Sequence, residues 1–114
     1  MKGESQEKRR IFKLDEAAAL LPRVRLLTAD AVGRIEGLRS RRKGGEDMAD
    51  LQAEADAAVQ TWTSALQDLG LEVKGLWLVD FDNGAGYYCW RWPEDRLEYY
   101  HSYEEGFRGR MRIQ

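Results

Sequence analysis

The residues best suited to chemistry lie in the last third of the chain. His101 is the only histidine and Cys89 the only cysteine among the 114 residues. A histidine can serve as an acid, a base or a metal ligand. Asp80 and Glu105 could join it around a divalent cation, so His101, Asp80 and Glu105 are the candidate metal ligands. Zinc sites usually have more nitrogen or sulfur ligands. We therefore favour the alternative, in which His101 is a structural imidazole bonded to backbone or to a nearby glutamate.

Arginines near His101 suggest an anion site. Arg91, Arg108 and Arg110 could hold a phosphate or carboxylate through paired hydrogen bonds. With His101 and Glu105 they form the candidate ligand-binding set. The alternative that we favour pairs Arg91 with Glu98 and the tail arginines with an acidic helix. Cys89 lies within a predicted strand, where a cysteine is usually an inert apolar side chain.

Aromatic residues crowd the same region. Residues 77–107 contain ten of the twelve aromatic side chains. Exposed aromatics on a basic sheet can stack nucleic-acid bases, but residues 74–114 carry six basic and seven acidic residues, which does not favour nucleic acid as a partner. Core packing is the preferred role, with Trp62, Trp90 and Tyr99 as the candidate residues of a protein interface.

Two helices are predicted to precede this region. Apolar residues recur at alternating intervals of three and four over residues 12–43 and again over 46–70. That spacing places each set on one helix face and resembles the seam of a coiled coil. Gly44 and Gly45 interrupt the pattern, so we expect an antiparallel helical hairpin. Its first helix carries net charge +3 over residues 14–43, while residues 44–73 carry −7.

A small sheet is predicted to follow over residues 76–101, because the apolar period changes to two. We expect three antiparallel strands, with Trp92 opposite Leu97 and Trp90 opposite Tyr99. This register places Tyr99 and His101 on the face that packs on the helices, and Cys89 on the opposite face. The fold class is thus α+β in a single domain over residues 1–114, with a disordered start at 1–10 and an irregular tail at 102–114.

Composition sets wider limits. The net charge of −2 gives no general attraction to nucleic acid or to an anionic membrane. The sequence has no apolar run long enough to span a bilayer. A single cysteine is consistent with a reducing cytoplasm, so we expect a cytoplasmic protein. Nothing in the sequence predicts a cofactor.

Several short motifs occur in a recognisable order. They are Phe12-Lys13-Leu14-Asp15-Glu16-Ala17, Leu78-Val79-Asp80-Phe81, Cys89-Trp90-Arg91-Trp92, Tyr99-Tyr100-His101 and Glu105-Gly106-Phe107-Arg108-Gly109-Arg110. From about Ile11 to Ile113 the chain resembles the small prokaryotic family catalogued as domain of unknown function 2203. The resemblance implies a bacterial or archaeal cytoplasmic protein with a helical hairpin and a short sheet, and it implies no activity.

Two functions follow from these observations. A hairpin with a small sheet buries little apolar surface by itself, which favours a non-enzymatic interaction module that self-associates as a dimer. The alternative is a protein that binds a small molecule or a metal around His101, with hydrolysis as its candidate reaction.

Overall fold

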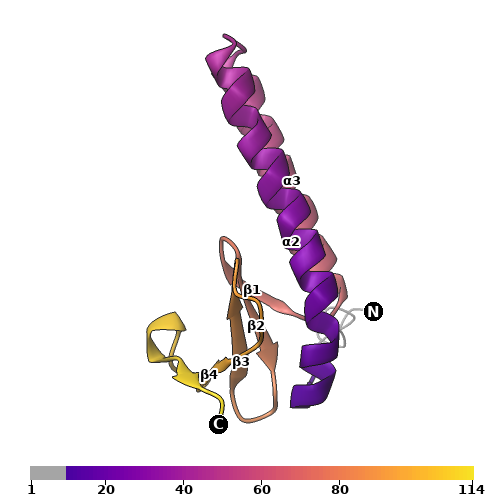
Figure 1. Cartoon of the computed structure of the whole chain (residues 1–114), viewed down its shortest axis with the longest axis vertical. Coiled ribbons are helices and arrows are strands. Elements are labelled where there is room, and N and C mark those ends of the chain that lie inside the picture. The colour runs from indigo at the N-terminus through magenta and orange to yellow at the C-terminus, as the bar shows by residue number, and fades with distance from the viewer. Residues whose placement is uncertain (1–9) are drawn as a thin grey trace, which may run out of the picture.

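The structure is a computed structural model that describes residues 10–114. The predicted disordered start at 1–10 therefore lies outside the described residues, apart from Arg10. Two long helices, α2 (Leu14–Lys43) and α3 (Met48–Asp68), form an antiparallel hairpin beside a sheet (Figure 1). The predicted α+β class is confirmed, because two helices are followed by an antiparallel sheet. Over residues 10–114, neither of the two long helices has the apolar stretch that a bilayer-spanning helix needs.

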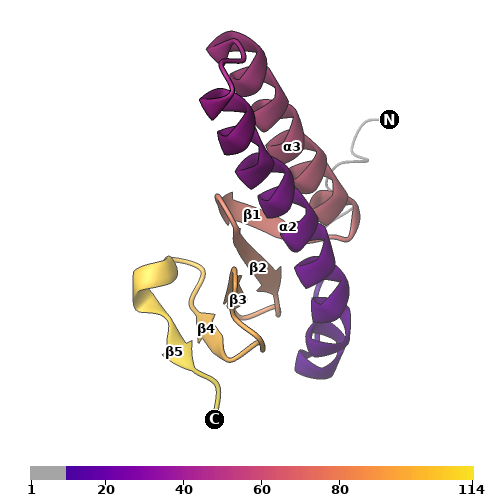
Figure 2. The same ribbon diagram turned by 45° about the horizontal axis from the view of Figure 1, so that its top comes forward.

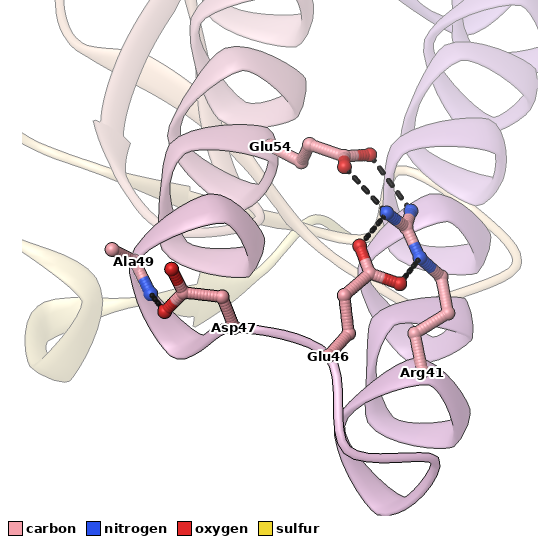
Figure 3. Close-up of polar contacts among 5 residues, drawn as sticks. All are labelled: Arg41, Glu46, Asp47, Ala49 and Glu54. Atoms are coloured by element: carbon pink, nitrogen blue, oxygen red, sulfur yellow. Dashed lines mark hydrogen bonds and ion pairs between the residues drawn. The ribbon is translucent and has the colours of Figure 1, made fainter.

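Short-range interactions set the ends of both helices. The Glu16 carboxylate accepts a hydrogen bond of 2.8 Å from the backbone N–H of Lys13, which satisfies a free donor at the start of α2. Asp47 caps α3 by accepting a 3.0 Å hydrogen bond from the backbone N–H of Ala49 (Figure 3). Gly45, with φ of +93°, supplies the left-handed backbone of the connecting turn. The helices therefore begin and end within a few residues of the predicted bounds.

The sheet has five antiparallel strands in the order β1-β2-β3-β4-β5, so the prediction of three strands was wrong. Its strands are β1 (Glu72–Gly75), β2 (Leu78–Asp82), β3 (Tyr87–Arg91), β4 (Tyr99–His101) and β5 (Met111–Arg112). The two unpredicted strands lie at the sheet edges. They are short and partly polar, so neither has the apolar alternation that identifies a strand in a sequence.

The C-terminal tail is also more regular than predicted. After β4 the chain forms a short 3-10 helix, η1 (Phe107–Gly109), and then returns as β5 to pair with β4. Figure 2 shows this segment folding back beside the sheet, on the side away from the helices. The tail therefore belongs to the sheet layer.

The pairing of β3 with β4 differs by one residue from the predicted register. Tyr87 lies opposite His101 and Cys89 lies opposite Tyr99. The predicted tight hairpin from Trp92 to Leu97 is absent, and the backbone N–H of Trp92 donates instead to the carbonyl of Trp77 at 3.0 Å. A shift of one residue moves every side chain of a strand to the other face. Tyr99 and His101 consequently lie on the same face as Cys89, which corrects the prediction.

The core fills the space between the hairpin and one face of the sheet. Val79, Phe81 and Trp90 contribute from the sheet and Trp62 from α3. Trp62 is 2% exposed, and its indole N–H donates to the Thr28 hydroxyl of α2 at 2.8 Å. A buried Trp N–H needs such a partner, because it has lost its water.

We expect Thr28→Val to lower the free energy of unfolding by about 1–3 kcal/mol, because the buried indole N–H of Trp62 then has no acceptor. Valine is nearly the same size as threonine, so the packing around it changes little. Urea unfolding measures the change. Thr61→Val on the exposed side of α3 is the matched control and should stay within about 0.5 kcal/mol of the wild type. An equal effect of the two substitutions would contradict the role of the hydroxyl.

Candidate metal centre

Polar side chains gather on the sheet face that turns away from the helices. In β2 the residues alternate, so Val79 and Phe81 enter the core while Asp80 and Asp82 point to the other side. Asp80 pairs directly with Cys89 of β3, and the next strand brings His101 opposite Tyr87. Three adjacent strands therefore place Asp80, Cys89 and His101 on one surface of the sheet.

These three side chains form a compact buried cluster. Asp80, Cys89 and His101 are 1%, 0% and 3% exposed. One oxygen of Asp80, the sulfur of Cys89 and one ring nitrogen of His101 all lie within 4.8 Å of one another. Around a tetrahedral zinc ion, such donor atoms are about 3.3–3.5 Å apart. Small side-chain movements would bring all three to bonding distance from one cation.

The orientation of the imidazole is fixed by the backbone. Nδ1 of His101 lies 2.8 Å from the carbonyl oxygen of Ser102. A carbonyl can only accept, so Nδ1 must carry a hydrogen and donate. The second nitrogen, Nε2, faces the Asp80 carboxylate at 3.0 Å. It donates to that carboxylate when the ring is protonated, and in the neutral ring its lone pair is open to a cation. An imidazole held in this way by its other nitrogen is typical of histidine metal ligands.

The Asp80 carboxylate is buried without adequate hydrogen bonding. Neither of its oxygens accepts a hydrogen bond of standard geometry from residues 10–114. The Nε2 atom of His101 lies 3.0 Å from the carboxylate, a distance that makes an ion pair when the imidazole is protonated. Burial raises the pKa of Asp80, although the nearby His101 and the Cys89 thiol oppose the shift. A buried carboxylate in this position would gain from a cation.

Cys89 has the properties of an inert thiol in the absence of a metal. Burial, assisted by the charge of Asp80, raises the pKa of Cys89 to about 12. A nucleophilic cysteine requires a lowered pKa. The cluster is therefore not a cysteine nucleophile with a histidine base, even though the structure brings Cys89 to the side of His101. A metal ion can still displace the thiol proton, because coordination stabilises the thiolate.

A pocket of about 300 Å³ opens beside the cluster. Its lining includes Asp80, His101, Tyr87 and Tyr103, and the tail supplies its outer wall from Glu104 to Phe107. The Tyr103 hydroxyl donates to Asp82 at 2.7 Å, which ties the tail to the end of β2. Pocket and cluster share Asp80 and His101, so a small molecule in the pocket would reach these two groups.

A glycine allows the end of β4 to approach the turn after β2. A Cβ atom on Gly86 would lie 2.5 Å from the carbonyl oxygen of His101. Any other residue at position 86 would therefore force the backbone at His101 or at position 86 to shift. Gly86 is a positioning residue, because its missing side chain sets the closeness of the two strands.

The candidate ligand-binding residues do not all come together. Glu105 lines the pocket, whereas Arg91 and Arg108 are exposed and lie outside it. Arg110 has only 13% of its side chain exposed, forms an ion pair with Glu94 at 2.9 Å, and stacks on Tyr99 and Phe107. Its guanidinium is already occupied by the protein.

The expected arginine pairings also differ from those observed. Arg91 lies opposite Leu78 in the sheet, while Glu98 is 3.5 Å from Arg112. Arg110 and Arg112 pair with Glu94 and Glu98 in the segment between β3 and β4, and not with the acidic helix. These differences follow from the shifted register and from the return of the tail as β5.

The candidate interface residues are mostly internal. Trp62 and Trp90 are 2% and 0% exposed, and each indole N–H is bonded within the chain, Trp90 to the carbonyl of Glu94 at 2.8 Å. Tyr99 is half-buried under Arg110. The two tryptophans therefore offer no surface to a partner.

Sequence reasoning missed Cys89 as a member of the cluster. The signal was present in β2, where Asp80 stands between apolar residues and must lie on the face opposite to them. Pairing β2 with β3 would have placed Cys89 beside Asp80, but β3 itself has no clear alternation of polar and apolar residues. The predicted pairing of β3 with β4 placed Cys89 on the face opposite His101, and the observed register places both on one face.

We expect native Cys89 to react with a thiol reagent such as DTNB at least about a hundredfold more slowly at pH 8 than the unfolded chain, because few of the buried thiols are ionised. The rate of colour release measures this, with the same protein in denaturant as the control. Equal rates in the two conditions would show that the thiol is accessible and ionised.

The matching family model is described as an uncharacterised conserved protein, DUF2203, and it covers residues 10–113. The chain belongs to this family, which confirms the resemblance found in its motifs. No curated protein and no solved structure matches the chain significantly.

Proposed function

We propose that this member of the DUF2203 family binds one divalent transition-metal ion through Asp80, Cys89 and His101. The observation that carries the proposal is the buried Asp80 carboxylate, which faces the Nε2 atom of His101 and accepts no hydrogen bond of standard geometry from residues 10–114. A cation between the two groups would satisfy the carboxylate and use the lone pair of the imidazole. The Cys89 sulfur lies close enough to complete the set.

The types of donor atom favour zinc or a similar ion. Thiolate sulfur and imidazole nitrogen bind Zn²⁺ or Co²⁺ well, whereas Mg²⁺ and Ca²⁺ prefer sites built from oxygen. The ligand set differs from the one suggested by the sequence, because Cys89 takes the place given to Glu105. Glu105 is exposed on the pocket wall, outside the group of three donor atoms.

Three protein ligands leave one position of a tetrahedral ion for water or a small molecule. Closed structural zinc sites have four protein ligands, while sites that bind or transform a substrate keep one open. The pocket of about 300 Å³ is lined by Asp80 and His101, so the open position would face it. This arrangement supports the binding of a small molecule at the metal, and it is the basis on which a hydrolase remains the second candidate.

Metal content is the direct test. We expect protein purified without a histidine tag to bind one Zn²⁺ or Co²⁺ per chain, measured by native mass spectrometry after dialysis against a small excess of the ion. His101→Ala and Cys89→Ser should each weaken binding by more than about a hundredfold, because each removes a direct ligand. Cobalt absorption would report sulfur coordination, which Cys89→Ser should abolish.

Glu105→Gln is the matched control for this measurement, since Glu105 lines the pocket without belonging to the three-atom group. It should bind one ion as tightly as the wild type. Circular dichroism shows whether each variant is folded. A folded wild type that binds no ion, or ligand variants that bind as well as the wild type, would contradict the proposal and leave Asp80 and His101 as an ion pair.

The open position can be probed separately in the cobalt-loaded protein. We expect azide to change the visible spectrum, because a small anion entering through the pocket would replace the water on the ion. Zinc-free protein is the control for any binding elsewhere. A spectrum unaffected by saturating azide would indicate a closed, structural site and would exclude a hydrolase.

A further inference from the structure

The helical hairpin extends well beyond the sheet. Figures 1 and 2 show the far ends of α2 and α3, near their connecting turn, with no sheet beside them. Burial along the face of α2 that packs on α3 falls toward this end. The residues of that face that lie nearer the sheet are buried, namely Ala17, Leu21, Val24, Thr28 and Ala31, while Ile35 and Leu38 are only half-buried. Met48, the first seam residue of α3, is 51% exposed. The far end of the hairpin therefore lacks a third layer over its apolar seam.

The uncovered seam forms a shallow groove of about 160 Å³, which we call the distal groove. Ile35, Leu38, Met48 and Leu51 form its apolar part, and Arg39 and Arg42 line its α2 side. An apolar centre bordered by charged side chains is the arrangement found in protein interfaces.

The charges beside the distal groove are available to a partner. Arg41, which does not line the groove, is held by Glu46 and by Glu54, with one bond to Glu54 of 2.8 Å (Figure 3). Its guanidinium lowers the pKa of both carboxyls through these hydrogen bonds. Arg39 and Arg42, by contrast, have no ion pair with any residue of the described part of the chain.

The α3 side of the hairpin has the opposite charge. This helix contains Asp50, Glu54, Asp56 and Asp68 and no basic residue, which gives it a net charge of −4. Asp56 lies one turn after the groove residue Gln52 and accepts a 3.0 Å hydrogen bond from its amide. Two unpaired cations thus line the groove on α2, and one acidic residue lies next to its α3 side.

We propose that the distal groove binds the distal groove of a second copy of this chain, related by a two-fold axis. In such a pair each α2 lies against the α3 of the partner, so Arg39 and Arg42 approach the acidic helix of the other copy. A two-fold interface must be complementary to itself, and a basic helix beside an acidic helix meets that condition. The two uncovered seams would cover each other, as in a four-helix bundle.

This inference is independent of the metal centre, which lies on the far face of the sheet. The dimer interface proposed here also differs from the aromatic interface that the sequence suggested. The groove uses aliphatic side chains and methionine at the end of the hairpin, in place of Trp62 and Trp90.

A charge-swap experiment tests the pairing. Native mass spectrometry of the full chain should show a dimer for the wild type. Arg39→Glu with Arg42→Glu in one variant should give a monomer, because the new carboxylates face the acidic α3 of the second copy. Asp56→Lys should weaken the dimer for the converse reason. Mixing the two variants should restore a dimer that contains one chain of each, since both contacts then pair opposite charges.

The apolar part of the groove has its own variant and control. Met48→Glu should reduce the dimer, whereas Leu26→Glu should not, because Leu26 is 74% exposed on α2 outside the groove. Circular dichroism confirms that each variant is folded. A wild type that shows one chain mass at every concentration overturns the proposal, as does a mixture of the charge-swap variants that forms no mixed dimer. A dimer that survives all these substitutions would place the interface elsewhere.

Discussion

The burial of one sheet face against the helical hairpin is the constraint on which the other features depend. Val79 and Phe81 of β2 pack with Trp62 and Trp90 between the two layers. Because strand side chains alternate, the same packing forces Asp80 and Asp82 to the opposite face. A slip of one residue in β2 would bury carboxylates in the core, at a cost of several kcal/mol. The core therefore fixes the place of the candidate metal centre.

The opposite face would be open to water without the tail. Residues 102–110 cross it, and β5 then pairs with β4. This cover removes water from Asp80, Cys89 and His101, which explains the raised pKa of the Asp80 carboxyl and of the Cys89 thiol. Desolvation without good internal hydrogen bonds is unfavourable for stability, and such sites are often functional. The tail thus sets the environment of these side chains as well as extending the sheet.

The two proposed sites lie at different parts of the molecule. The metal centre is on the sheet face that turns away from the helices, and the distal groove is near the turn between α2 and α3. A dimer formed through the hairpin ends would leave the pocket beside His101 accessible from solvent. Self-association and ligand binding, which the sequence presented as alternatives, are therefore compatible in one protein.

The sequence by itself determined the local elements. The apolar intervals of three and four, with Gly44 and Gly45 between them, predicted the hairpin, and the alternation in β2 predicted a strand. Only the tertiary structure decided which residues meet. The pairing of β3 with β4, one residue away from the expected register, brings Cys89 and His101 to one face. The edge strands β1 and β5 depend on their neighbours in the same way. Strand pairing joins residues that are distant in the chain, so no local pattern records it.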